Sequence, residues 1–210
     1  MSGRALRLVE PDGTVRTLAE DPDERVSWEA TDFVAAEEMG RSRGHWWSPD
    51  GRHVAACRVD ETEVPSWWIG NPARPDQPAV EHRYPAAGSR NPDVRLFVLG
   101  ALGGQPALEV SWDRVRYEYL AAVSWRAKGL LLTVQRARSS ARWSCSVSIS
   151  RPGRRHRSRS TPTTVGIELV PGVPGFLGDG RLVTAADRGG ARRLLVDGHP
   201  VSPEGSRCAR

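Results

Sequence analysis

Residues 32–65 read DFVAAEEMGRSRGHWWSPDGRHVAACRVDETEVP, and this stretch decides the fold. An aromatic segment, 45–47, is followed by a polar turn, 48–52, and then by an apolar segment, 53–59. A turn with Pro, Asp and Gly between two apolar runs is typical of a β-hairpin, because glycine adopts the positive φ that tight turns need. We therefore expect a strand, a turn and a strand here, preceded by one short helix over 32–39.

The same pattern recurs twice further along the chain, as AVSWRAKGLLLTVQ at 122–135 and VPGFLGDGRLVTAA at 173–186. In each unit the strand after the turn is rich in Val, Leu and Ala, which indicates a strand buried on both faces. Hairpins with alternating polar and apolar residues around D-G or G-G turns interleave with these units. Two inner and two outer strands make the four-stranded antiparallel blade of a β-propeller.

The fold class that we predict is all-β, a partial β-propeller with one short helix that carries a Glu-Glu pair. Blades are expected at about 5–20, 45–111, 118–165 and 170–205. Repeat folds need several neighbouring repeats to close a core, and this number of blades cannot close a ring. We therefore interpret residues 1–210 as a fragment of a propeller domain.

The composition agrees with β-structure and argues against several other classes. Hydrophobic residues make up 39% of the chain, and 21 Gly and 16 Pro are too many for long helices. No apolar run approaches the ~20 residues of a membrane span, and no secretory signal is visible, so we expect a cytoplasmic protein without membrane contact. Neither the three cysteines (Cys57, Cys145, Cys208) nor the five histidines have metal-ligand spacing, so we predict no metal and no cofactor.

One segment differs from the rest of the chain in composition. Residues 136–160 contain eight Arg, eight Ser and no acidic residue, and the net charge falls from +5 to −3 when these eight arginines are set aside. We consider three interpretations of the anomalous segment 136–165: an Arg/Ser insert that binds RNA, a solvated loop, or a translation in the wrong reading frame. Its abrupt edges and its length, which is that of a missing blade hairpin, favour the frame-shifted interpretation.

Several local motifs occur in an order that resembles a known family. DFVAAEEM resembles an Asp-aromatic-Val-x-x-Glu-Glu helix, and WWSPDG and DETEVP follow it at the expected separation. YPAAGSRNPDV at 84–94 and YEYLAAVSW at 117–125 continue the series. Over about 1–135 and 167–205 the chain is similar to the N-terminal propeller of the dipeptidyl peptidase IV family, prolyl oligopeptidase-like serine peptidases. In that family the propeller caps a C-terminal α/β-hydrolase domain, and the enzyme removes dipeptides from peptide N-termini.

The resemblance implies a substrate-binding role for Glu37 and Glu38. Without it, two glutamates on a short helix would be interpreted as a solvated face. In the family, such a pair anchors the free α-ammonium of the substrate. The helix itself has the expected signals: Asp32 can cap its N-terminus, Val34 and Met39 can face inward, and Gly40 can end it.

We identify no nucleophile elbow, so we assign no catalytic residue and expect the chain to be inactive by itself. The leading hypothesis is the substrate-recognition part of a serine dipeptidyl peptidase, with peptide N-termini as substrate and a C-terminal α/β-hydrolase domain as partner. One alternative is a non-enzymatic propeller that binds proteins. The other is a basic protein that binds nucleic acid through 136–160, although the leading hypothesis needs no nucleic acid.

Two further features follow the glutamate pair in the sequence, a pair of tryptophans and an acidic cluster. Trp46 and Trp47 should alternate faces of their strand, with one in the core and one elsewhere. Asp60, Glu61 and Glu63 form an acidic cluster, which we interpret as a solvated turn, with a brace for the glutamate helix or for a partner domain as the alternative.

Overall fold

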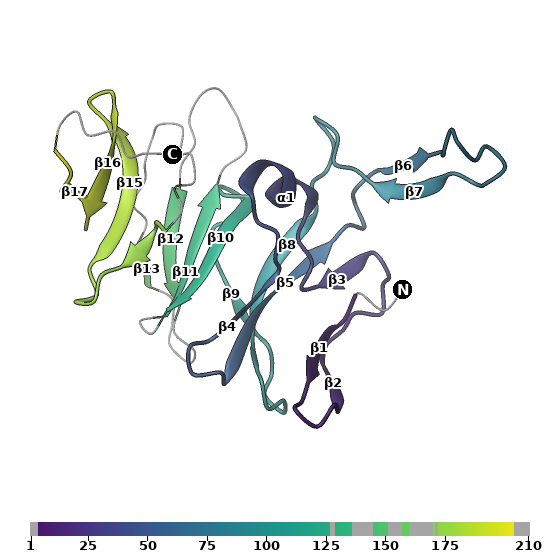
Figure 1. The fold of residues 1–210 in the computed structure, drawn as a ribbon, viewed down its shortest axis with the longest axis horizontal. Coiled ribbons are helices and arrows are strands. Elements are labelled where there is room, and N and C mark those ends of the chain that lie inside the picture. The colour runs from purple at the N-terminus through teal and green to yellow at the C-terminus, as the bar shows by residue number, and fades with distance from the viewer. Residues whose placement is uncertain are drawn as a thin grey trace.

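The computed structural model describes residues 4–126, 129–135, 145–150, 157–159, 170 and 172–203, without the side chains of 145–150 and 157–159. The described chain is mostly β, with one short helix, α1 (Phe33–Met39), and several small antiparallel sheets (Figure 1). The prediction of a β fold with one helix is therefore confirmed. The arrangement of successive sheets is consistent with part of a β-propeller.

Three sheets follow one another along the chain. The first contains β3 (Val26–Trp28), β4 (His45–Trp47), β5 (His53–Asp60), β8 (Asp93–Gly100) and β9 (Leu108–Val110). The second contains β10 (Tyr119–Arg126), β11 (Gly129–Gln135), β12 (Cys145–Ser150) and β13 (Arg157–Arg159). The third contains β14 (Gly175–Phe176), β15 (Leu182–Arg188), β16 (Ala191–Val196) and β17 (His199–Pro200).

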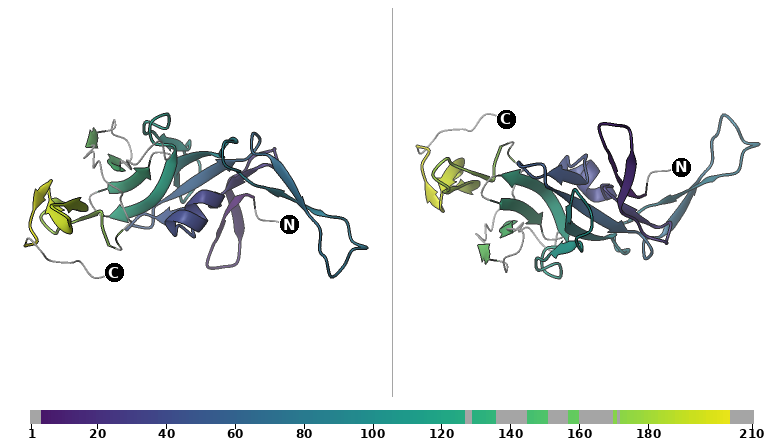
Figure 2. Two further views of the ribbon diagram at one scale, coloured as in Figure 1. Left: turned by 90° about the horizontal axis from the view of Figure 1, so that it is seen from above. Right: turned by 90° about the horizontal axis from the view of Figure 1, so that it is seen from below.

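Two hairpins stand apart from these sheets. β1 (Leu6–Val9) pairs with β2 (Val15–Ala19), and β6 (Ser66–Ile69) pairs with β7 (Val80–Arg83). The β6–β7 hairpin contains the Pro-rich excursion of the sequence and extends away from the body in both views of Figure 2. No described helix is long and apolar enough to cross a bilayer.

The turn over 48–52 forms as the sequence predicts. Gly51 has a φ of 67°, and its amide donates to the Ser48 carbonyl oxygen at 3.0 Å. The Ser48 hydroxyl donates to Asp50 at 2.6 Å and accepts from the His53 amide at 2.9 Å. These side-chain bonds fix the hairpin between β4 and β5.

The main core lies between the first and second sheets. β5, β8 and β9 contribute one wall and β10 and β11 the other, and the buried side chains include Cys57, Leu96, Leu120 and Leu132. The opposite face of β5 packs against the β1–β2 hairpin, and the opposite face of β11 packs against the third sheet through Leu131. β5 and β11 are thus buried on both faces, as their composition predicts.

β15 differs from the other two strands that follow a turn. Only Leu182 and Ala186 of β15 are buried, and the strand is otherwise half-exposed or exposed. The reason is that no described segment covers its second face. Enrichment in Val, Leu and Ala therefore indicates that a strand can be buried on both faces, and the neighbouring sheet decides whether both faces are covered.

The blade boundaries and the anomalous segment stay predictions. In 136–165 only the backbones of β12 and β13 are described, and they pair with β11 and with each other. The remainder of that segment, and with it the frame-shifted interpretation, lies outside the described residues.

Candidate functional site

The helix α1 is an insertion in one edge of the first sheet. β4 pairs with Val54–Ala56 of β5, and β3 pairs with the same edge further on, at Arg58–Asp60. Between these pairings, the Glu29 amide donates to the Cys57 carbonyl oxygen at 2.9 Å, and the Cys57 amide donates to the Gly44 carbonyl oxygen at 2.7 Å. The chain thus leaves the sheet and returns to it at a single residue, Cys57.

This junction requires glycine at position 44. A Cβ on Gly44 would lie 2.1 Å from the Glu29 carbonyl oxygen and 2.3 Å from that of Ala30. Both contacts are with backbone, so no side-chain rotation could relieve them. The close approach of the two chain segments is what closes the base of the insertion.

The caps of α1 are those that the sequence predicts. The Asp32 carboxylate accepts from the Ala35 amide at 3.1 Å, and Gly40 ends the helix with a φ of 64°. The inward face differs from the expectation, because Ala35 is buried whereas Val34 and Met39 are only half-buried. The small side chain of Ala35 permits close packing, and the larger ones lie at the edges of the contact.

A buried ion pair joins the two ends of the insertion. Arg41 Nη2 lies 2.5 Å from Asp32 Oδ1, and the two side chains are 3% and 5% exposed. Arg41 Nε also donates to the Leu120 carbonyl oxygen of β10 at 3.0 Å, and Nη1 donates to the Arg43 carbonyl oxygen at 3.2 Å. Arg41 Nη1 lies 3.6 Å from Cys57 Sγ as well. One guanidinium therefore connects the helix with both sheets.

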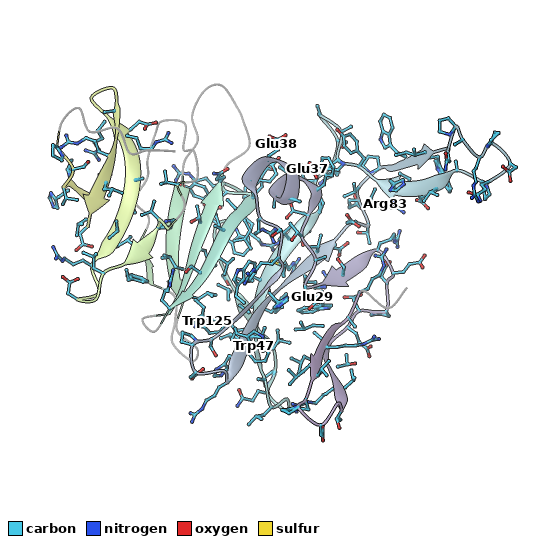
Figure 3. All side chains as sticks on the ribbon, viewed as in Figure 1. Glu29, Glu37, Glu38, Trp47, Arg83 and Trp125 are labelled. Carbon is cyan, nitrogen blue, oxygen red and sulfur yellow. The ribbon has the colours of Figure 1, made fainter. Side chains whose placement is uncertain are left out.

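Glu37 and Glu38 lie in the last turn of α1, and both are exposed (Figure 3). Neither makes an ion pair within the described part of the chain, and the last turn of α1 holds no basic residue. Carboxylates are unfavourable at this end of a helix, because the macrodipole is negative there. The pair and the helix end together make a negative site that would attract a cation.

A groove of about 740 Å³ begins where α1 ends. Its lining includes Gly40, Arg43, Trp46, Trp47 and Trp125, from the helix end, β4 and β10. As predicted, Trp46 packs against the core, while Trp47 is exposed, and Figure 3 shows Trp47 and Trp125 below α1. The acidic helix end therefore adjoins an aromatic surface.

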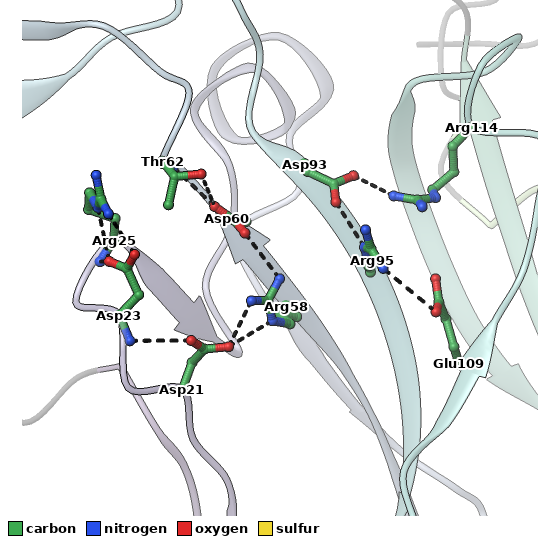
Figure 4. Close-up of polar contacts among 10 residues, drawn as sticks. All are labelled: Asp21, Asp23, Arg25, Arg58, Asp60, Thr62, Asp93, Arg95, Glu109 and Arg114. Carbon is green, nitrogen blue, oxygen red and sulfur yellow. Dashed lines mark hydrogen bonds and ion pairs between the residues drawn. The ribbon is translucent and has the colours of Figure 1, made fainter.

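The acidic cluster that follows β5 is largely structural. Asp60 accepts from Arg58 at 3.3 Å and from the Thr62 hydroxyl at 2.7 Å, and Arg58 also bonds Asp21 at 2.7 Å (Figure 4). Burial raises the pKa of the Glu61 carboxyl, against the charges of nearby arginines. Arginine therefore braces Asp60, and Glu61 is half-buried, whereas Glu63 is exposed.

A second arginine–carboxylate chain crosses from the first sheet to the loop before β10. Arg95 bonds Asp93 at 2.8 Å, and Asp93 also pairs with Arg114 (Figure 4). Glu109 lies 3.9 Å from Arg95. These residues hold β8, β9 and the loop together.

The sequence pattern G-x-S-x-G occurs once in the chain, as GRSRG at 40–44. A nucleophile elbow places its serine between a strand and a helix. Here Ser42 follows a helix and precedes a strand, and no hydrogen bond joins it to a histidine among the described residues. Ser42 therefore does not form a nucleophile elbow, and no catalytic role is assigned to it.

The chemistry available to the site is binding. Burial raises the pKa of the Cys57 thiol to about 11, so it is protonated and unreactive at neutral pH. In the described part of the chain no His, Cys, Asp and Glu side chains gather in a group that could hold a metal ion. The exposed carboxylates of Glu37 and Glu38 can accept hydrogen bonds from a cation.

Arg41 is the residue that sequence reasoning missed. Its signal was available, because an N-cap aspartate that becomes buried needs a cationic partner. Arg41 is the first basic residue after the helix. Burial of the cap could not be seen in the sequence, and a capping aspartate is usually exposed.

The profile of the family described as "Dipeptidyl peptidase IV (DPP IV) N-terminal region" matches residues 8–193. Inactive dipeptidyl peptidase 10 of Rattus norvegicus is 33% identical over 99 residues, which are 45% of this chain and 12% of that protein. Dipeptidyl peptidase 4 of Bos taurus is 25% identical over 202 residues, 79% of this chain and 26% of that protein.

Among solved structures, the crystal structure of Porphyromonas gingivalis dipeptidyl peptidase 4 aligns with 91% of this chain and 28% of its own, with a TM-score of 0.69 and 19% identity. This likeness supports the fold. The chain spans only 12% and 26% of the two curated relatives named above. The match to the family profile nonetheless extends over most of the chain, and the chain therefore belongs to the dipeptidyl peptidase IV N-terminal region family.

Proposed function

We propose that this chain is the substrate-recognition portion of a serine dipeptidyl peptidase, in which Glu37 and Glu38 anchor the α-ammonium of a peptide N-terminus. The observation that carries the proposal is a pair of exposed carboxylates that form no ion pair with any described residue, on a helix end that is fixed to two sheets. Two carboxylates can accept several charge-assisted hydrogen bonds from one ammonium.

The pair contributes positioning and no bond-making step. Two residues of an extended peptide span at most ~7 Å. A fixed ammonium therefore determines which peptide bond lies at the reacting centre, and dipeptides are released. The partner that supplies the nucleophile is a C-terminal α/β-hydrolase domain, and the expected location is cytoplasmic.

Recognition of the ammonium is separate from hydrolysis. One of the relatives is named an inactive dipeptidyl peptidase, so membership of the family does not by itself imply activity. The proposal is therefore tested by binding. Binding of nucleic acid through 136–160 concerns side chains outside the described residues and stays an alternative hypothesis, since our leading hypothesis includes no nucleic acid.

The test compares the dipeptide amide H-Gly-Pro-NH2 with its N-acetylated form in calorimetric titrations of the 210-residue chain. Glu37→Gln or Glu38→Gln should weaken binding of the free amine by about 10- to 150-fold, since an ionic hydrogen bond contributes ~1.5–3 kcal/mol. Binding of the acetylated form should not change. Glu24→Gln is the matched control, because Glu24 is also an exposed glutamate.

Equal binding of the free and acetylated peptides by the wild-type chain would refute the ammonium site. So would unchanged binding of the free amine by both glutamine variants. In either case the pair is a solvated helix face.

A further inference from the structure

We propose that Arg41, together with Asp32, is a positioning residue that holds α1 in the orientation that its two glutamates need. The proposal rests on the proposed function, because it concerns how Glu37 and Glu38 are held. It adds to that function a buried arginine, which touches no substrate and acts through the helix.

Packing alone holds α1 weakly. The helix has 7 residues, of which only Ala35 is buried. Helices shorter than ~12 residues are marginal in water unless tertiary contacts support them. The other contacts of α1 are made by the half-buried Val34 and Met39 and by the Phe33 ring, whose centroid lies 5.1 Å from that of Tyr84. These contacts lie at the edges of the helix, so rotation about its axis is resisted less than translation.

Rotation of α1 matters because of where the carboxylates point. Adjacent side chains on a helix diverge by ~100°. Glu37 and Glu38 can therefore share one ammonium only in a narrow range of helix orientations. A device that fixes the rotation of the helix would fix the site.

The Asp32–Arg41 pair has the contacts of such a device. Asp32 caps the first turn, at 3.1 Å from the Ala35 amide, and its other oxygen lies 2.5 Å from Arg41. Arg41 follows the last turn and reaches the Leu120 carbonyl oxygen at 3.0 Å and Cys57 Sγ at 3.6 Å. Both ends of the helix are thereby tied to each other, to β5 and to β10.

Arginine suits this position in ways that lysine does not. The planar guanidinium offers donors in several fixed directions, whereas an ammonium is a compact point charge. A buried ion pair contributes little net stability compared with apolar packing of similar volume. What the ion pair adds over apolar packing is a fixed geometry between its two partners. Because Asp32 neutralises Arg41, the charge of Arg41 does not offset the negative field of Glu37 and Glu38.

The test removes both buried charges at once and so separates positioning from stability. In the double variant D32N/R41Q the net charge is unchanged, no buried charge is left unpaired, and Asn remains a good N-cap. R41K keeps the positive charge and loses the planar guanidinium with its donors in several fixed directions. The measured quantities are the urea midpoint of the 210-residue chain and the ratio of its dissociation constants for acetylated and free Gly-Pro amide.

We expect the ratio to fall by about tenfold, the effect of one lost ionic hydrogen bond, in both D32N/R41Q and R41K. The midpoint of the double variant should stay close to that of the wild type. R52Q, in which an exposed arginine is changed, should keep both values.

A wild-type ratio in D32N/R41Q and R41K would overturn the proposal and leave Arg41 with a structural role only. If the double variant does not fold, R41K alone tests the positioning role, because its buried charge remains paired with Asp32. A wild-type chain that does not distinguish the two peptides would refute the ammonium site itself, and the positioning role with it.

Discussion

Replacement of Leu132 by alanine tests whether the first two sheets share a packed core. Leu132 lies in β11 and is 0% exposed, in the cluster that joins β5 and β8 to β10 and β11. The substitution removes a methine and two methyl groups, which at ~0.8 kcal/mol each contribute about 2.4 kcal/mol. The cavity that remains raises the expected loss in the free energy of unfolding to about 3–4 kcal/mol.

The assay is urea denaturation of the chain, followed by tryptophan fluorescence, with a thermal melt as a second measurement. For a chain of this size about 2–4 °C of Tm corresponds to each kcal/mol, so Tm should fall by about 6–16 °C. Leu102→Ala is the matched control, because Leu102 is 84% exposed and its loss should be within about 0.5 kcal/mol.

Leu131→Ala tests the opposite face of the same strand. Leu131 is also buried, but it belongs to the small cluster with Leu182 that joins β11 to the third sheet. A small cluster relaxes around a deletion more readily, so the expected loss is about 2–3 kcal/mol. A loss below about 1 kcal/mol for Leu132→Ala would refute the reasoning, because a residue in a packed core cannot be truncated at so small a cost.

Three further predictions concern single residues. Gly44→Ala should lower the urea midpoint strongly, because its Cβ would meet two backbone oxygens, whereas Gly70→Ala, with nothing within 4 Å, should not. In a variant in which the other two cysteines are replaced by serine, Cys57 should react with a thiol reagent at pH 8 only after urea is added, because burial raises its pKa to about 11. Rapid labelling of the native chain would contradict the burial of Cys57. The raised pKa of Glu61 means that the folded state holds the proton more tightly than the unfolded state. Its contribution to stability is therefore fully present below its ordinary pKa of 4.5 and is lost as the pH rises. The free energy of unfolding of Glu61→Gln should therefore increase relative to that of the wild type as the pH increases from 4 to 7. A difference between the two proteins that does not depend on pH would contradict this.

Much of the architecture could be predicted because its signals are local. The turn at Gly51 and the caps at Asp32 and Gly40 follow from the conformational preferences of the residues themselves. That Trp46 packs against the core while Trp47 is exposed follows from the two-residue period of a strand. Such preferences act over a few residues, so the chain carries them whatever surrounds it.

The candidate site could be predicted only in part. The sequence and its resemblance to a family point to Glu37 and Glu38, and the helix lies where the residues indicate. The inward face of the helix was predicted incompletely, because Val34 and Met39 are only half-buried and Ala35 makes the buried contact. Which face of a short helix is buried depends on the shape of its neighbours.

The sequence by itself determined the recurring hairpins, the turn at Gly51, the ends of the helix and the family, whereas β3 and the β6–β7 hairpin appeared only in the structure. Only the tertiary structure decided how the helix is held. The Asp32–Arg41 pair is buried because β10 lies over it, and the Arg41 bond to the Leu120 carbonyl oxygen joins residues 79 positions apart. Gly44 is required because Glu29 returns to the same point on β5. Local preferences cannot specify such contacts, because burial and close approach arise only when distant segments pack against one another and exclude water.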